Sequence, residues 1–212
     1  MTLAVVSLAG MRHATPHDAD TAATILTEAF RTDPFMAYLW PDPERPNLPN
    51  PVAVRAFMET AFDAFIPHGH SYLIDDRAAA LWSPPGIEAD KAAVGEIFAE
   101  FGDPAIMETA TANFAIMHDC HPDEPHFYLA DIGATDAARG QGLGSALIER
   151  VLDVCDSDGF HAHLDATSRR SRSLYERHGF ETVTELVFAP GVFLYPMTRP
   201  PRERSVGGAT SR

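Results

Sequence analysis

The sequence predicts an α/β fold, because strand-like and helix-like segments alternate along its 212 residues. The clearest indication is a strand–turn–helix unit in the second half of the chain. Aromatic and apolar residues of strand type run from His126 to Ile132, a glycine-rich turn follows, and apolar residues then recur at three- and four-residue steps to Val154. Helical and hairpin patterns lie on both sides of this unit.

Upstream of the glycine turn, the pattern predicts a strand, two helices, a hairpin and two more helices. The first strand ends at Ala14, and Thr15 is a candidate N-cap because a proline follows it. Asp33-Pro34 and the proline-rich stretch 41–51 are interpreted as breaks between helices. Apolar spacing predicts the helices at 15–30, 54–65, 92–101 and 107–117, and the hairpin pairs 71–74 with 78–82.

Downstream of the turn, the pattern predicts one more strand and a final hairpin. The strand covers 160–166, where His161 and His163 share one face, and the hairpin joins 180–188 to 192–197. Residues 1–9 are expected to lead into the first strand, because they lack the basic start of a secretory signal. The arginine-, serine- and glycine-rich residues 201–212 are predicted to be disordered.

The glycine turn has the properties of a phosphate-binding loop. Gly140, Gly142 and Gly144 allow positive φ and close approach to a ligand, and the free N–H groups of the following helix favour an anion. Arg139 adds a guanidinium that can hold phosphate oxygens bidentately. The dinucleotide pattern would require a third glycine where Ser145 stands, and the lysine of a P-loop is missing, so the turn predicts a different pyrophosphate site.

The stretch Arg139–Gly144 resembles the acyl-CoA signature of the GNAT acetyltransferase superfamily, Gln/Arg-x-x-Gly-x-Gly/Ala. Residues 171–180 resemble a second block of that superfamily, which usually reads Ala-x-x-Leu-Tyr-Glu-Lys-x-Gly-Phe, and the two blocks occur in the expected order. The likeness covers about residues 11–200 and is weakest in the middle. Residues 127–134 and 174–180 look most like the branch that contains puromycin N-acetyltransferase. This likeness does not identify the acceptor, because the residues that would surround an acceptor lie upstream, where the likeness is poor.

The resemblance implies one GNAT domain over residues 1–200, followed by the tail 201–212. Its sheet would be mixed and mostly antiparallel, with six to seven strands splayed between the fourth and fifth and flanked by helices. The implied reaction is direct transfer of acetyl from acetyl-CoA, as acyl-donor cosubstrate, to a small-molecule primary amine. A protein N-terminus or lysine as acceptor, and a non-catalytic regulatory module that binds acyl-CoA, remain the alternatives.

The resemblance also assigns roles to residues of the cofactor site. The backbone of Ile132, Gly133 and Ala134 would pair with the pantetheine amides and polarise the thioester carbonyl. Ser168 and Ser171, where many relatives carry asparagine and alanine, would lie near the cofactor. The pyrophosphate would be held by Arg139, Gly140, Gln141, Gly142, Leu143, Gly144 and Ser145.

Two residues are the predicted catalytic groups. Tyr175 aligns with the tyrosine that protonates the departing CoA thiolate, although packing on an amphipathic helix is the alternative. Asp131 is the first candidate for general base, since a carboxylate inside an apolar strand is costly unless it is hydrogen-bonded or used; a buried partner or a role in orienting the amine explains it equally well. Glu59 and Asp63 come next. In the GNAT layout the acceptor pocket would be capped by Phe30, Phe35, Tyr38, Trp40, Phe57, Phe62 and Phe65, most of them core residues.

Composition limits the partners. A net charge of −14 argues against a nucleic-acid partner and weakly favours a cationic acceptor. The sequence has no run of eighteen apolar residues, the length needed to span a membrane. Cys120 and Cys155 are too few for a disulfide framework, so a cytoplasmic protein is expected, either alone or as a homodimer. No metal is assigned, because the spacing of His118, Asp119, Cys120, His121 and His126 matches no zinc pattern. The arginines at 169, 170 and 172 fit a solvated helix face and a CoA phosphate contact equally well.

Overall fold

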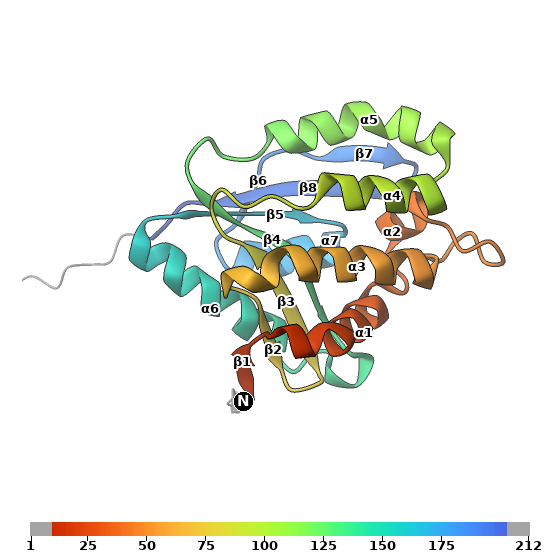
Figure 1. Ribbon diagram of the computed structural model, residues 1–212. Helices are drawn as coiled ribbons and strands as arrows, with labels where there is room; N and C mark the ends of the chain where they lie inside the picture. The colour runs from red at the N-terminus through yellow and green to blue at the C-terminus, as the bar shows by residue number, and fades with distance from the viewer. Residues whose placement is uncertain (1–9, 203–212) are drawn as a thin grey trace, which may run out of the picture.

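The computed structural model describes residues 10–202, and it has an eight-stranded mixed sheet at its centre (Figure 1). The strand order is β1-β2-β3-β4-β5-β8-β6, and β7 pairs with β8 outside this path. All pairings are antiparallel except β4 with β5, which are parallel. The strands are β1 (Met11–His13), β2 (Tyr72–Ile74), β3 (Ala78–Ser83), β4 (His126–Ala134), β5 (His161–Ala166), β6 (Glu181–Thr182), β7 (Leu186–Ala189) and β8 (Val192–Arg199).

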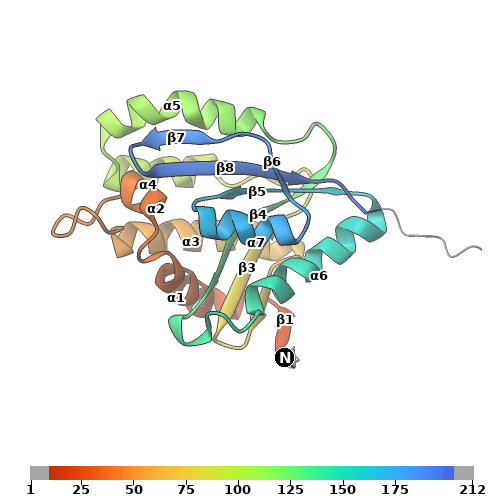
Figure 2. The same ribbon diagram turned by 180° about the vertical axis from the view of Figure 1, so that it is seen from behind.

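Helices cover both faces of the sheet, so the protein has three layers (Figures 1 and 2). One core packs α1 and α3 against one face, with α2 and α4 beside them, and a second core packs α6 and α7 against the other. Helix α5 lies along β7 at the edge of the sheet. The helices are α1 (Ala19–Phe30), α2 (Pro34–Leu39), α3 (Pro51–Phe65), α4 (Lys91–Phe101), α5 (Pro104–Asp119), α6 (Leu143–Asp158) and α7 (Arg169–Arg177), with 3-10 turns at Pro16–Asp18, Ile66–His68 and Asp136–Ala138.

Helix α2 corrects the interpretation of Asp33-Pro34 as a simple break. Asp33 is the N-cap of this helix, and its carboxylate accepts hydrogen bonds from the N–H groups of Phe35 and Met36 at 2.9 and 3.0 Å. An Asp-Pro pair serves equally well as a turn and as an N-cap followed by proline at the first helical position, and here the second use prevails. The other predicted helices and the 71–82 hairpin are confirmed, and Thr15 is the N-cap of the turn that precedes α1.

The sheet is split between β4 and β5. The two strands pair only from His126 to Leu129 on β4 and from His161 to Leu164 on β5, while β4 continues alongside β3 to Ala134. A β-bulge lies at the same point, because Trp82 of β3 pairs with Leu129 and Leu81 pairs with Asp131, which leaves Ala130 unpaired. A bulge bends its strand and increases its twist, so Ala130 directs β4 away from β5 where the split opens. The predicted splay is therefore present.

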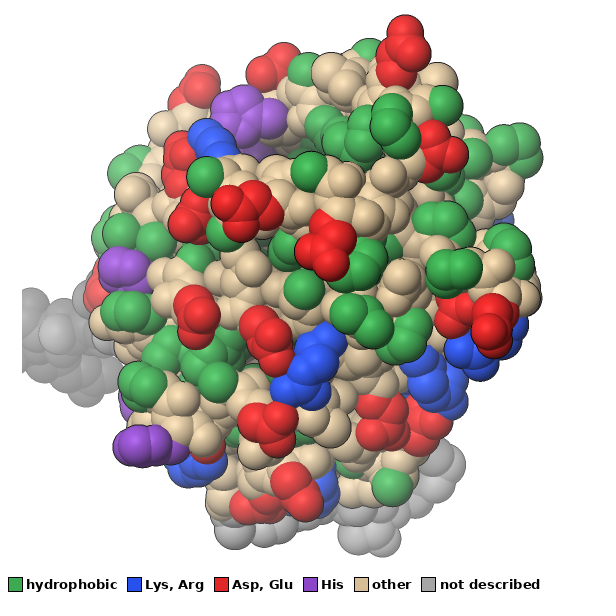
Figure 3. Space-filling view, turned by 45° about the vertical axis from the view of Figure 1, so that its right-hand side comes forward, with side chains coloured by type: hydrophobic (Ala, Val, Ile, Leu, Met, Phe, Trp, Pro, Cys, Tyr) green, Lys and Arg blue, Asp and Glu red, His purple; other side chains and the backbone are tan. Residues whose placement is uncertain are grey.

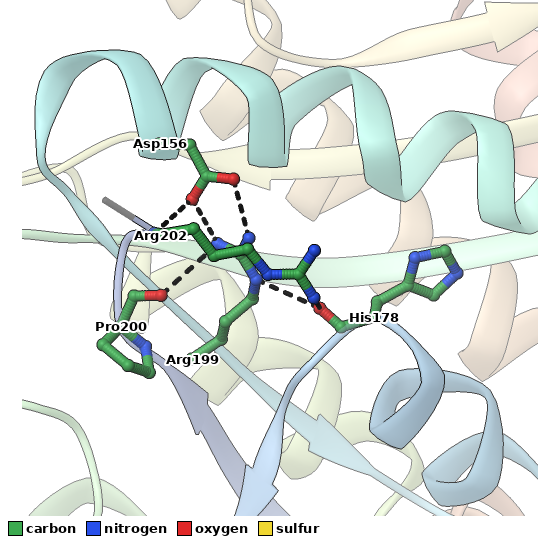
Figure 4. Close-up of polar contacts among 5 residues, drawn as sticks. All are labelled: Asp156, His178, Arg199, Pro200 and Arg202. Carbon is green, nitrogen blue, oxygen red and sulfur yellow. Dashed lines mark hydrogen bonds and ion pairs between the residues drawn. The ribbon is translucent and has the colours of Figure 1, made fainter. Parts of the chain in front are cut away.

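The C-terminal strands complete the sheet. The predicted final hairpin is confirmed as β7 with β8, but its first arm is interrupted, so that β6 and β7 pair with different parts of β8. At the end of β8, the buried guanidinium of Arg199 forms two 2.7 Å hydrogen bonds with Asp156 of α6 and donates to the carbonyl of His178 (Figure 4). This contact fastens β8 to α6 and to the turn after α7.

The surface in Figure 3 carries acidic side chains spread over the whole visible face, as the net charge of −14 leads one to expect. Among residues 10–202, no helix combines the length and the apolar character needed to cross a membrane. The expectations for residues 1–9, and for the tail from 203 onward, lie outside the described residues.

Candidate active site

A cavity of about 1210 Å³ passes through the sheet at the split between β4 and β5. Its walls come from both cores: Leu143 and Tyr175 belong to the α6–α7 side, while Phe35 and Trp40 belong to the α1–α3 side. The cavity therefore joins the glycine turn on one face of the sheet to a largely apolar chamber on the other. A site of this shape can bring two molecules together from opposite sides of the sheet.

The glycine turn forms the first end of the cavity. Gly140 and Gly142 have φ of +76° and +81°, in the left-handed region that favours glycine, which explains why the sequence places glycine there. Gly142 is the N-cap of α6 and offers no capping side chain, and the first helical bond runs from the N–H of Ala146 to the Gly142 carbonyl. No side chain of the N-cap residue therefore occupies the N–H groups at the start of α6, and such groups can bind an anion.

The polar side chains of the turn differ in their placement. Arg139 lines the cavity, but its guanidinium donates to the Ala29 carbonyl at 3.0 Å and lies 3.2 Å from the Asp136 carboxylate. Gln141 does not line the cavity, because its amide donates back to the Ala137 carbonyl at 2.9 Å. The backbone of the turn is therefore better placed for an anion than either side chain.

The strand end beside the turn has one free edge. Ile132, Gly133 and Ala134 line the cavity and pair with β3, but β5 no longer covers their other side. A Cβ on Gly133 would lie 2.4 Å from the Cβ of Ala29, so glycine at this position also lets α1 approach β4 closely. The free edge can pair with an extended ligand such as the pantetheine arm that the sequence predicts.

Helix α7 brings Tyr175 to the split. Ser168 and Ser171 line the cavity and form the N-terminal cap of α7, with Ser168 Oγ accepting from the Ser171 N–H at 3.1 Å. Tyr175 is 7% exposed and its ring packs against Phe180. Burial raises the pKa of Tyr175, and the Asp131 carboxylate raises it further, so the phenol keeps its proton at neutral pH.

The three arginines near α7 do not act together. Arg170 lines the cavity, where it can contact an anionic ligand. Arg169 lies over the ring of Phe193, and Arg172 pairs with Glu176 at 2.8 Å. The solvated-face interpretation thus fits two of the three.

Asp131 lies where the bulge changes the alternation of β4. Phe127 and Leu129 face α6, whereas Asp131 pairs with Leu81 and faces the α1–α3 core. The residue is 3% exposed, its Oδ2 has no hydrogen-bond partner among the described residues, and it lines the cavity. Burial raises the pKa of Asp131 to about 7. A carboxyl with this pKa is half-ionised at neutral pH, which suits an acceptor of protons.

The end of the cavity on the α1–α3 side, where the sequence predicts the acceptor, is mostly apolar. Of the aromatic residues expected there, Phe30, Phe35, Trp40 and Phe57 line it, whereas Phe62 and Phe65 lie in the core, and Tyr38 does not line it. The remaining apolar lining consists of Met36, Leu39, Val94, Phe98, Met107, Phe114, Met117 and Leu194. Helices α4 and α5, which the sequence predicts as acceptor-side elements, therefore line this end of the cavity.

Two polar residues of this chamber, Asp33 and Thr167, were not predicted from the sequence. Asp33 lines it and accepts a 2.5 Å hydrogen bond from the Thr167 hydroxyl, and burial raises the pKa of Asp33. The Asp-Pro signal for a helix start was the only local indication of Asp33.

The other predicted bases, Glu59 and Asp63, do not line the cavity, and Glu59 pairs with Arg55 at 2.8 Å.

The fold and the site together define a class: an α/β protein in which a glycine turn and the start of a helix lie beside a split parallel strand pair. The sequence matches the acetyltransferase (GNAT) family over residues 51–180. The chain belongs to this family and is an acetyltransferase.

Individual relatives agree with the family. An uncharacterized N-acetyltransferase of Schizosaccharomyces pombe (strain 972) is 24% identical over 180 residues, which cover 77% of this chain and 70% of the relative. A crystal structure from Corynebacterium glutamicum, described as histone acetyltransferase HPA2 and related acetyltransferase, is 26% identical, with a TM-score of 0.67 and coverage of 92% and 98% of the two chains. Arylalkylamine N-acetyltransferase 2 of Aedes aegypti has the same fold, with a TM-score of 0.64, 18% identity and coverage of 91% and 98%.

Proposed function

We propose that this protein transfers the acetyl group of acetyl-CoA directly to a small-molecule primary amine. The observation that carries the proposal is the single cavity that joins the uncapped N-terminus of α6 to the buried Asp131 carboxyl across the split in the sheet. An anionic cofactor and a basic acceptor could meet there from opposite sides of the sheet.

The residues present fit acetyl-CoA. The free N–H groups after Gly142 suit its pyrophosphate, and the uncovered edge of β4 at Ile132–Ala134 suits the amides of its pantetheine arm. Acetyl-CoA supplies an activated thioester carbonyl when bound. A backbone N–H on the free edge of β4 would stabilise the negative charge that develops on the carbonyl oxygen.

Asp131 and Tyr175 would move the two protons of the reaction. A primary amine reaches the site largely as an ammonium ion, and the ionised Asp131 carboxylate can take its proton so that the nitrogen lone pair attacks the thioester. Collapse of the tetrahedral adduct breaks the C–S bond, and the departing CoA thiolate takes the phenol proton of Tyr175. The nitrogen loses its second proton as the amide forms; this proton restores the Tyr175 phenol, and Asp131 releases the first proton to solvent. Because the Asp131 charge raises the pKa of Tyr175, protonation of Asp131 by the amine makes the phenol a stronger acid for the next step.

The lining of the acceptor chamber favours an amine with an aromatic or aliphatic body. Phe35, Trp40 and Phe114 present apolar surface, while Asp33 and Asp131 are carboxyl groups that can attract the ammonium. The Aedes aegypti relative is an arylalkylamine N-acetyltransferase, which agrees with this chemistry.

A release assay for free CoA thiol with a panel of amines tests the proposal. The panel contains a phenylalkylamine, puromycin, a linear polyamine, a lysine peptide and a peptide with a free N-terminus. We expect the phenylalkylamine or puromycin to be acetylated most efficiently. Preferential turnover of either peptide would replace the small-molecule proposal with a protein acceptor, and acetyl-CoA binding without turnover of any amine would favour a regulatory module.

The pH dependence of the reaction is expected to report Asp131. A base must be ionised to act, and burial raises the pKa of Asp131 to about 7, so kcat/KM for one amine should rise as pH increases through 7. Asp131→Asn should remove this limb of the profile and lower the plateau by about 10²-fold or more. Glu59→Gln is the matched control, expected to keep the limb, because Glu59 pairs with Arg55 and does not line the cavity.

A stability measurement supplies an independent readout for Asp131. Its native pKa exceeds the unfolded value of about 3.9, so the native state binds more protons between pH 4 and 7 and loses stability as pH rises through that window. Asp131→Asn should therefore raise Tm more at pH 8 than at pH 5. A kinetic limb that disappears in Glu59→Gln and persists in Asp131→Asn would assign the base to Glu59 instead.

A further inference from the structure

Three metal-ligand side chains meet beside the acceptor end of the cavity. His121, His163 and Asp165 each offer one ligand atom, and these atoms lie within 4.8 Å of one another. His121 follows α5, whereas His163 and Asp165 stand two residues apart on β5 and therefore share one face of the strand. The ring centroids of the two histidines are 4.2 Å apart.

A chain of hydrogen bonds fixes which nitrogen of His121 is free. His126 Nδ1 lies 2.9 Å from the Glu124 carbonyl, which can only accept, so His126 donates there and its Nε2 can accept. His121 Nδ1 lies 3.0 Å from His126 Nε2 and must be the donor. A neutral imidazole that carries its proton on Nδ1 has a lone pair on Nε2, so Nε2 of His121 can bind a cation.

His163 and Asp165 are each oriented by one hydrogen bond, which leaves one further polar atom of each side chain without a partner among the described residues. His163 is 0% exposed; its Nδ1 bonds to Thr198 Oγ1 at 2.8 Å, while its Nε2 is buried without a partner among the described residues. Asp165 accepts from the Tyr128 hydroxyl at 3.0 Å through Oδ2, while its Oδ1 is likewise buried and unpartnered. Burying unpaired polar atoms costs free energy, and a bound cation would remove that cost at both residues.

We propose that His121, His163 and Asp165 bind a divalent transition-metal ion, with Zn²⁺ the favoured one. Two imidazole nitrogens and one carboxylate oxygen suit Zn²⁺, and three protein ligands leave a fourth position for water or another small ligand. The bonds to His126, Thr198 and Tyr128 then have the usual role of outer groups, which orient the ligands. Mg²⁺, which prefers an octahedron of oxygens, would bind poorly.

Binding requires a small contraction of the cluster. Ligands about 2.0–2.2 Å from Zn²⁺ lie about 3.3–3.6 Å apart in a tetrahedron. Because His121 belongs to the segment between α5 and β4, it can approach β5 without displacing a strand. The ion would thus fasten the end of α5 to the sheet and support a wall of the acceptor chamber, which Met117 of α5 and Asp165 both line.

Metal titration of the untagged, chelator-treated full chain tests this site. We expect calorimetry to give one Zn²⁺ per chain and Zn²⁺ to raise Tm. Co²⁺ should give the intense visible absorption of a tetrahedral site. Changing a group outside the ligand set typically costs about 10–100-fold in affinity, so loss of a direct ligand in His121→Ala or Asp165→Asn should cost at least about 100-fold.

His68→Ala is the matched control, because His68 is an exposed histidine at the end of the turn after α3. It should bind Zn²⁺ as the wild type does. The proposal is overturned if the wild type shows no stoichiometric Zn²⁺, if His121→Ala and Asp165→Asn retain wild-type affinity, or if Mg²⁺ competes at equal concentration. Asp165→Asn keeps the size of the side chain, and His121 lies outside the strands, so both variants are expected to fold.

Discussion

Tyr175→Phe is expected to lower the rate of the chemical step by about 10²-fold or more while the dissociation constant of acetyl-CoA stays unchanged. The substitution keeps the ring and its packing against Phe180 and removes only the hydroxyl. Without that proton the CoA thiolate must leave unprotonated or recruit water, and the 7% exposure of the residue leaves little room for water. Acetyl-CoA binds through the glycine turn and the edge of β4 in our proposal, so its affinity does not depend on the phenol.

Single-turnover rates are the measurement to make, because slow product release would hide the effect in kcat. Tyr195→Phe is the matched control, since Tyr195 is a fully buried tyrosine on β8 that does not line the cavity. It should leave the single-turnover rate unchanged. Wild-type chemistry in Tyr175→Phe would assign Tyr175 to packing and leave water or the acceptor to protonate the thiolate.

Gly142→Asp is expected to lower acetyl-CoA affinity below what calorimetry detects. The new carboxylate would lie at the N-terminus of α6 and repel the pyrophosphate. It would also accept hydrogen bonds from the N–H groups that would otherwise bind the phosphates. Like charges brought together in this way cost several kcal/mol. Aspartate tolerates the left-handed φ of +81° better than most residues, so the fold should survive.

Two further variants separate charge from shape at this site. Gly142→Asn has nearly the same size and backbone preference as Gly142→Asp without the charge, and it should lose far less affinity. Arg139→Ala should cost about 1.5 kcal/mol, or roughly tenfold, because Arg139 already bonds to the Ala29 carbonyl and Asp136. Unchanged affinity in folded Gly142→Asp would show that the phosphates bind elsewhere, and equal losses in Gly142→Asp and Gly142→Asn would exclude charge as the cause.

The sequence predicted the elements that depend on local chemistry. Gly140 and Gly142 have the positive φ that their spacing indicates, whereas Gly144 lies inside α6 and does not. The apolar periodicity located α3 and α6 within a few residues. Asp131 stood out because a carboxylate is unusual in an apolar strand, and the structure buries it beside the split. Such features could be predicted because a short stretch of sequence determines them.

Features that depend on two segments far apart in the chain could not be predicted from the sequence. The bulge at Ala130 is a property of the pairing between β3 and β4, so no pattern within β4 alone reveals it. The meeting of His121 with His163 likewise requires the parallel pairing of β4 and β5, which the spacing of histidines in the 118–126 stretch could not indicate.

The position of β8 constrains how the chain can fold as it is made. Although β8 follows all its partners in the sequence, it lies between β5 and β6, and Arg199 fastens it to α6. During synthesis, β5 therefore waits with an unpaired edge until residues through Arg199 have left the ribosome, and the second side of the split has no fixed position before then. Unpaired strand edges attract other chains, so a newly made chain in which β8 has not yet docked is exposed to aggregation through the edge of β5.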